Sequence, residues 1–255
     1  MPSTSPCALL AQVPVTGCAN LLNNDQRLAS IQLMSRISPV MEAHVFEARD
    51  FVGGHPVLDF INTVTGRDRT PRDWLPDYDA WLAWLARSSV CSASDVEQLA
   101  ARAAEAPGTA ERALRDARRL REALFGIVGA RSHGAPVAAA DLETLERAWK
   151  RAMNGRRLIA TAGRIGFDDP ADPADLHLPA HRLALDAVKL LEALPDGRLR
   201  MCAGSNCAWL FIDRSKTGRR KWCDMATCGN VAKARRHYRA VRRAPDGSTS
   251  HDAPE

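Results

Sequence analysis

The chain has 255 residues, of which 45% are apolar and 25% are charged. This length allows a sizeable core in one or two domains. The sequence contains no run of 18 or more uncharged apolar residues and no basic segment followed by an apolar core, which argues against a membrane-spanning helix and a secretory signal. We therefore expect a soluble, cytoplasmic protein whose seven cysteines are thiols or metal ligands rather than disulfides.

The formal net charge of +5 conceals two parts of opposite sign. Residues 196–243 hold 13 Lys and Arg against three Asp, whereas the rest of the chain holds 22 Lys and Arg against 27 Asp and Glu. A cationic segment on an otherwise acidic protein is typical of contact with phosphates. Arg-rich helices are also common as solvated faces, so charge alone does not decide the function.

The two ends of the chain differ in composition from the middle. Residues 1–45 mix Pro, Ser and Asn with short apolar runs of no sustained period, which predicts a disordered or weakly ordered extension. An equally good interpretation is that translation starts at Met41. Residues 244–255 are predicted to be a disordered tail. Between the ends we expect a helical domain over residues 46–196 and a small module over residues 197–243.

Breakers and caps mark the first helices of the helical domain. The cluster Gly53-Gly54-His55-Pro56 precedes a short apolar helix over residues 57–63. Asp77 is placed to cap a second helix, in which Trp81 and Leu85 share one face. These aromatic and aliphatic side chains indicate core packing.

Two further caps are predicted downstream. Ser94 and Glu97 have the spacing of a capping box, which would open a third helix that ends near Ala104. Thr109 is placed to cap a long helix. Its apolar positions recur at helical spacing: Ala113, Ala117, Leu120, Leu124 and Val128.

The domain ends in two more helices with strand-like residues between them. One helix should start at Asp141 and run through Met153, and the other should cover residues 179–194. Residues 157–167 contain β-branched side chains and two glycines, which favours a small β-hairpin. The turn at 195–197 marks the domain boundary. The fold class is therefore mainly α with small β elements (α+β).

Four cysteines near the C-terminus are spaced as two close pairs. Cys202 and Cys207 form one C-x4-C pair, and Cys223 and Cys228 form another after 15 residues. Two such pairs supply the four thiolates of one tetrahedral zinc ion, with no position left open for catalysis. The pattern thus predicts a structural zinc ion. A four-cysteine iron–sulfur centre and four unrelated buried thiols remain as alternatives.

The residues around the cysteines predict a treble-clef-like module. Residues 199–202 and 208–212 read as two strands joined by a tight turn, in which Gly204 and Asn206 suit a left-handed backbone. Cys228 should lie at the start of the final helix, where the helix dipole favours a thiolate.

The final helix has one narrow apolar arc and a broad basic arc. Val231, Ala234, Tyr238 and Val241 form the apolar arc, which we expect to pack against Trp209 and Phe211. The basic arc and the preceding loop should contact DNA phosphates. The predicted DNA-binding residues are Arg214, Lys216, Arg219, Arg220, Lys221, Lys233, Arg235, Arg236 and Arg239.

Polar residues in the first apolar helix form a second candidate site. His55, Asp59 and Asn62 are either the floor of a ligand pocket or, as we favour, a buried structural network. His177 and His181 would line the same space if the fold brings them there. The sequence lacks the common hydrolase, phosphate-loop and metalloprotease motifs, so we do not expect an enzyme.

The C-terminal motif resembles a known family. Residues 222–237, Trp-Cys-Asp-Met-Ala-Thr-Cys-Gly-Asn-Val-Ala-Lys-Ala-Arg-Arg-His, together with the upstream cysteine pair, resemble the CGNR zinc finger. The segments Gly53–Pro56 and Leu58–Thr63 and the helix with Trp81 resemble the ABATE domain that usually precedes this finger. The resemblance implies a bacterial transcriptional regulator with a sensor-like helical domain ahead of a DNA-binding finger.

One residue departs from the family motif. Val231 stands where the family name has Arg, but the helical wheel places it on the apolar arc, so we expect it to be tolerated.

The resulting hypothesis is a regulator that binds DNA through a zinc-built module, with one structural Zn²⁺, nucleoid association, and a small-molecule effector and a homodimer as candidate partners. One rival is a zinc-structured module that binds RNA or protein without sequence-specific DNA recognition. Another rival is a nuclease, which would require an open metal position that four cysteine ligands do not leave.

Overall fold

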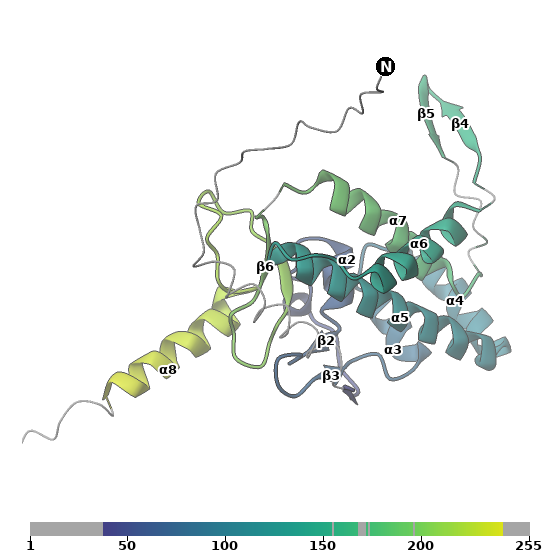
Figure 1. Cartoon of the computed structure of the whole chain (residues 1–255). Coiled ribbons are helices and arrows are strands. Elements are labelled where there is room, and N and C mark those ends of the chain that lie inside the picture. Colours follow the sequence, from purple (N-terminus) through teal and green to yellow (C-terminus); the bar gives the residue numbers. More distant parts are fainter. Residues whose placement is uncertain (1–37, 155, 168–171, 173, 196, 242–255) are drawn as a thin grey trace, which may run out of the picture.

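The computed structural model describes residues 38–154, 156–167, 172, 174–195 and 197–241. It is mainly α with small β elements, as predicted, and a helical domain precedes a small C-terminal module (Figure 1). No helix in this part of the chain has the length and apolar character needed to cross a membrane.

A three-stranded sheet lies near the start of the described chain. β1 (Val40–Met41) pairs in parallel with β3 (Arg72–Asp73), which pairs antiparallel with β2 (Val64–Thr65). Phe46 is buried in the main core. The prediction of a disordered or weakly ordered extension is therefore wrong for residues 38–45, because pairing with a strand 32 residues away is not visible in local composition. Residues 1–37 and 244–255 lie outside the described residues.

The first helices form as their caps predict. After the short turn η1 (Ala48–Asp50), α2 (Pro56–Ile61) follows the glycine-rich cluster, and α3 (Tyr78–Leu85) begins after Asp77, whose side chain accepts from the Ala80 N–H at 2.8 Å. Their aromatic side chains stack in the core, with Trp81 and Trp84 ring centroids 5.1 Å apart.

Two of the predicted caps are wrong. α4 (Ala93–Glu105) is capped by Ser92 together with Asp95. Ser92 is the non-helical residue before the helix and Asp95 is the third helical residue, whereas Ser94 and Glu97 both lie within the helix. α5 (Pro107–Ser132) begins before Thr109, since the fixed φ of Pro107 suits the first helical position.

α5 is the central helix of the domain. Its predicted apolar residues are all buried: Ala113, Ala117, Leu120, Leu124 and Val128. α6 (Ala139–Met153), which begins two residues before Asp141, and α7 (Leu178–Ala193) pack with α5. β4 (Leu158–Thr161) and β5 (Arg164–Phe167) pair antiparallel, which confirms the predicted β-hairpin. Both strands are exposed along their length.

Two ion pairs, one fully buried and one half-buried, fix strand β3 and the loop between β2 and β3 to α5. Arg121 donates to both carboxylate oxygens of Asp73, at 2.8 and 2.5 Å, and Arg67 donates to both oxygens of Glu122, at 2.5 and 3.0 Å. Arg67 also lies over the ring of Phe125. Removing one partner would leave a buried charge uncompensated.

The C-terminal module begins with the hairpin of β6 (Leu199–Met201) and β7 (Leu210–Ile212). Leu199 and Leu210 belong to the same core as the helical domain, so the hairpin continues that core. A π-helical turn, η2 (Met225–Gly229), then leads into α8 (Asn230–Val241), which extends away from the body of the molecule (Figure 1).

Candidate metal centre and nucleic-acid interface

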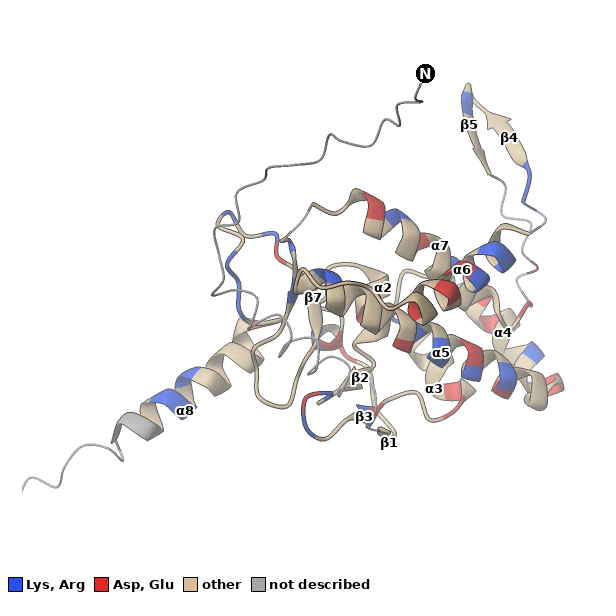
Figure 2. Cartoon of the chain, viewed as in Figure 1, with Lys and Arg blue, Asp and Glu red and all other residues tan. Residues whose placement is uncertain are grey.

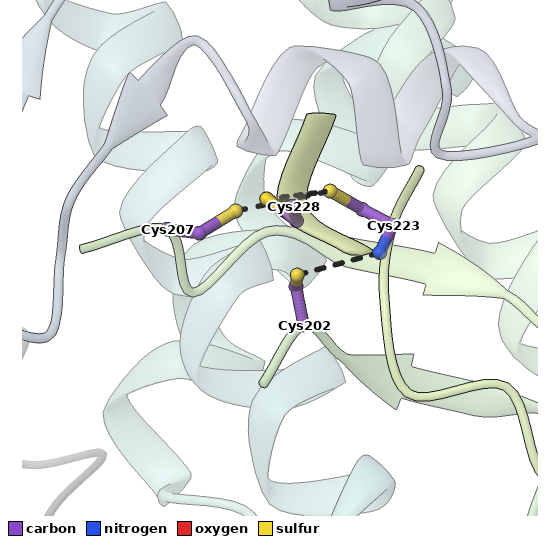
Figure 3. Close-up of side chains that lie close together, drawn as sticks. All are labelled: Cys202, Cys207, Cys223 and Cys228. Atoms are coloured by element: carbon purple, nitrogen blue, oxygen red, sulfur yellow. Dashed lines mark hydrogen bonds between the residues drawn. The ribbon is translucent and has the colours of Figure 1, made fainter. Parts of the chain in front are cut away.

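The four cysteine thiols meet at one point of the module. Cys202 follows β6, Cys207 precedes β7, Cys223 lies in the returning loop, and Cys228 lies in η2. Their sulfur atoms all lie within 4.8 Å of one another, and Cys202, Cys207 and Cys223 are buried. Figure 3 shows the four side chains converging from separate segments of the chain.

The spacing of the sulfur atoms fits one tetrahedral ion. The Sγ atoms of Cys207 and Cys223 are 3.8 Å apart, and those of Cys223 and Cys228 are 3.7 Å apart. A tetrahedron with Zn–S bonds of about 2.3 Å has sulfur–sulfur edges of about 3.8 Å. These separations are far longer than the S–S bond of about 2.05 Å in a disulfide. The site can therefore hold a metal ion with four thiolates and no open position.

Backbone N–H groups donate hydrogen bonds to one of the zinc-binding sulfur atoms. The N–H groups of Gly204 and Cys223 each donate to Cys202 Sγ at 3.3 Å. Gly204 is needed for space, because a Cβ there would lie 2.9 Å from Cys228 Sγ. The prediction of a left-handed backbone is confirmed at Asn206, with φ of 62°, but not at Gly204.

The fourth cysteine lies at a helix start, as predicted. The carboxylate of Asp224 accepts from the Thr227 N–H at 2.9 Å and so caps the turn that carries Cys228. Gly229 follows it, where a Cβ would contact Met225 at 2.8 Å and Trp222 at 3.3 Å. The positive end of the α8 dipole favours a thiolate at this position.

The comparisons with known proteins agree with this architecture. Residues 54–193 match the ABATE family model, described as "Putative stress-induced transcription regulator". The chain belongs to the ABATE family. Residues 198–240 match the CGNR zinc finger. Together with the four-cysteine geometry, this match shows that the finger holds one structural zinc ion. A comparison with curated proteins finds no match.

The CGNR finger is fastened to the ABATE domain by backbone hydrogen bonds. The Ile212 N–H donates to the Gly53 carbonyl at 2.9 Å, and the Gly66 N–H donates to the Cys207 carbonyl at 3.1 Å. In addition, Asn206 Oδ1 accepts from the Thr70 hydroxyl at 2.8 Å. The turn between the first two zinc ligands is thus held by residues that sequence reasoning did not assign to the site.

The candidate pocket residues of the ABATE domain are engaged with the backbone. His55 Nδ1 accepts from the Val57 N–H at 3.2 Å, Asp59 Oδ1 accepts from the Gly53 N–H at 2.8 Å, and Asn62 bonds to Leu210. Burial raises the pKa of Asp59 to about 6. These contacts support the structural network that we favoured over a ligand pocket.

The two histidines of α7 do not join that network. His177 and His181 line a small cavity of about 120 Å³ with residues of α5 and α6. Neither His55 nor Asp59 lines this cavity.

Lys and Arg residues are frequent in the loop that follows β7 and in α8 (Figure 2). Seven of the predicted DNA-binding residues are exposed: Arg214, Lys216, Arg219, Lys221, Lys233, Arg235 and Arg236. Arg235 also donates to the Ser205 hydroxyl, and Arg214 and Arg220 have contacts within the protein. Arg214 donates to the Gly54 carbonyl at 2.8 Å, and Arg220 donates to the Trp222 carbonyl at 2.7 Å and lies over Phe211. The side chain of Arg239 lies outside the described part of the structure.

The apolar arc of α8 does not pack as predicted. Val231 is 50% exposed and Tyr238 is 63% exposed. Phe211 is covered by Arg220 instead, and Trp209 meets Trp74 edge-to-face. A helical wheel identifies which side chains share an arc, but it does not say whether a partner surface lies opposite. The burial of Val241 lies outside what the structure describes.

Proposed function

We propose that this protein is a transcriptional regulator that binds duplex DNA through its CGNR finger. The observation that carries the proposal is the set of seven exposed cationic residues on a zinc-built module, in a chain whose remaining part is net negative. Such a distribution favours contact with phosphates through the module alone.

The shape of α8 supports the same proposal. Its 12 residues span about 18 Å at 1.5 Å per residue. Among its described side chains, all except that of Ala232 are exposed, so the helix is open to a partner on most sides. The major groove of B-DNA, about 12 Å wide, accepts an α-helix.

Zinc has a scaffolding role in this proposal, and the protein is not an enzyme. Four thiolates fill a tetrahedral coordination sphere, which leaves no position for an activated water or a substrate oxygen. The ion holds the segments on either side of the hairpin together and orients the first turn of α8. The arginines and lysines then supply the contacts with DNA.

The proposal is tested with the zinc-loaded full chain and sheared genomic DNA. Sequencing of the retained fragments should reveal a recurrent sequence, and a duplex carrying it should bind more tightly than a scrambled duplex or an RNA of equal length. Removal of zinc with a chelator, or Cys223→Ser, should abolish this preference. Equal binding of the duplex and the RNA would favour the rival RNA-binding module. A recurrent sequence retained without zinc would contradict the scaffolding role.

A further inference from the structure

A cavity of about 830 Å³ lies between α8, the turn that carries Cys202 and Cys207, and the ABATE domain. This volume falls in the range of roughly 300–1,000 Å³ that is typical of small-molecule sites, which often lie at domain junctions. Cys207, Cys223 and Cys228 line one end of the cavity. A single zinc ion at that end fills only a small part of it.

One wall of the cavity is aromatic and comes from both domains. Trp74 of the ABATE domain and Trp209 of the finger line it, with ring centroids 5.7 Å apart in an edge-to-face arrangement. Trp209 is 8% exposed, and its Nε1 is buried with no hydrogen-bond partner among the described residues. This N–H has almost no accessible surface, so it does not face the cavity, and the rings alone form the aromatic surface.

Three arginines also line the cavity. Arg235 and Arg236 reach it from α8, and Arg49 reaches it from η1. Arg235 also donates to the Ser205 hydroxyl, and Arg49 pairs with Glu47 at 2.9 Å. Asp50, the acidic residue of the lining, accepts from His44 Nε2 at 2.9 Å. Zn²⁺ with four thiolates carries a net charge of −2 and Asp50 carries −1, so the three arginines leave the lining neutral overall. An anion is therefore held by direct contact with the arginines beside the aromatic surface, and not by net charge.

We propose that this cavity binds a small aromatic anion, whose ring lies on the tryptophan wall and whose carboxylate, sulfonate or phosphate meets the arginines of α8. Guanidinium groups bind such anions with paired, charge-assisted hydrogen bonds. The ligand would join α8 to the ABATE domain.

The site also gives the ligand a route to regulation, which rests on the proposed function. Arg235 and Arg236 are both cavity residues and proposed phosphate contacts. A ligand that neutralises them lowers the affinity for DNA, and DNA lowers the affinity for the ligand by the same factor. The coupling needs no change in the fold, because both partners use the same two side chains.

The direct test uses 8-anilinonaphthalene-1-sulfonate, a fluorescent aromatic anion, with the zinc-loaded full chain. We expect one probe per chain. Ala232→Trp places an indole inside the cavity and should abolish binding, whereas Ala234→Trp adds the same group on α8 outside the cavity lining and should leave it unchanged. Equal affinities of these two variants, or no binding by the natural chain, would overturn the proposal.

A second pair of variants tests the charge. Arg236→Ala should weaken probe binding about tenfold, in keeping with the loss of a charge-assisted hydrogen bond. Arg219→Ala removes an exposed arginine that does not line the cavity and should have no effect. Equal losses in the two variants would show binding by general charge and overturn the site. One zinc per chain in each variant confirms that the finger is intact.

The coupling is measured separately with the selected duplex. Saturating probe should raise the Kd for DNA, and the duplex should raise the Kd for the probe by the same factor; unchanged constants would overturn the coupling. If the chain binds no DNA at all, the proposed function fails, but the probe titrations without DNA still decide whether the cavity is a site.

Discussion

The side chain of Asn62 and the backbone of Leu210 form a reciprocal pair of hydrogen bonds. Asn62 Nδ2 donates to the Leu210 carbonyl at 2.9 Å, and the Leu210 N–H donates to Asn62 Oδ1 at 2.8 Å. Both residues are buried, and they join the ABATE domain to the second strand of the finger hairpin. The finger is therefore built onto the core of the ABATE domain rather than tethered to it.

Asn62→Ala should destabilise the zinc-loaded protein by about 3 kcal/mol, because it leaves the buried N–H and C=O of Leu210 without partners. Urea unfolding at saturating zinc measures the difference. Gln98→Ala, which removes an exposed amide from α4, serves as the control and should change stability by less than about 0.5 kcal/mol. Equal stabilities of the two variants would contradict a structural role for the Asn62 pair.

Gly204→Ala should weaken zinc binding by about tenfold or more. The added Cβ would lie 2.9 Å from Cys228 Sγ and 3.3 Å from Cys202 Sγ, so the turn and its ligands must shift. Competition with a chromophoric chelator gives the zinc affinity. Gly166→Ala, whose Cβ meets nothing within 4 Å, is the matched control and should bind zinc like the natural chain. A Gly204 variant with undiminished affinity would argue against the tight packing at the metal centre.

Sequence reasoning succeeded where chemistry depends on local spacing. The four zinc ligands, the Asp77 cap and the buried positions of α5 all follow from residues a few positions apart. It failed where the outcome depends on distant partners. The ion pairs of Arg121 with Asp73 and of Arg67 with Glu122 link segments about 50 residues apart, and no short sequence motif predicts them.

The sequence predicted only part of the candidate site, because some of its residues come from segments far apart in the chain. The cysteines specify the metal, but the second wall of the cavity beside them comes from Trp74, which lies 135 residues before Trp209. A residue such as Arg220 has the composition of a DNA contact and is instead held by the Trp222 carbonyl and the Phe211 ring. Charge in a sequence thus indicates a cationic module without saying which of its members face solvent.

Comparison with Asp59→Asn should show that ionisation of Asp59 lowers the free energy of unfolding of the natural protein as the pH rises. Burial raises the pKa of Asp59 from 3.8 to about 6, so the folded state binds the proton more tightly than the unfolded state. The stability contributed by the neutral carboxyl is full below pH 4 and is lost as the pH rises through about 6, by about 3 kcal/mol at most. An amide oxygen can still accept the Gly53 N–H.

The stability of the Asp59→Asn variant relative to the natural chain should therefore increase between pH 4 and pH 7. Urea unfolding of both proteins at matched zinc isolates this difference, since other titrating groups are common to the two. A difference that does not change with pH would contradict the raised pKa of Asp59.

We propose that exposed arginines on a zinc-held helix bind the phosphates of DNA, and the salt dependence of binding measures these contacts. Arg235→Ala with Arg236→Ala should flatten the slope of log Kobs against log salt by about two, since each phosphate contact contributes about 0.9. Arg115→Ala with Arg119→Ala, an exposed pair on α5, should leave the slope unchanged. A slope unaltered by the α8 pair, at full zinc content, would contradict the account.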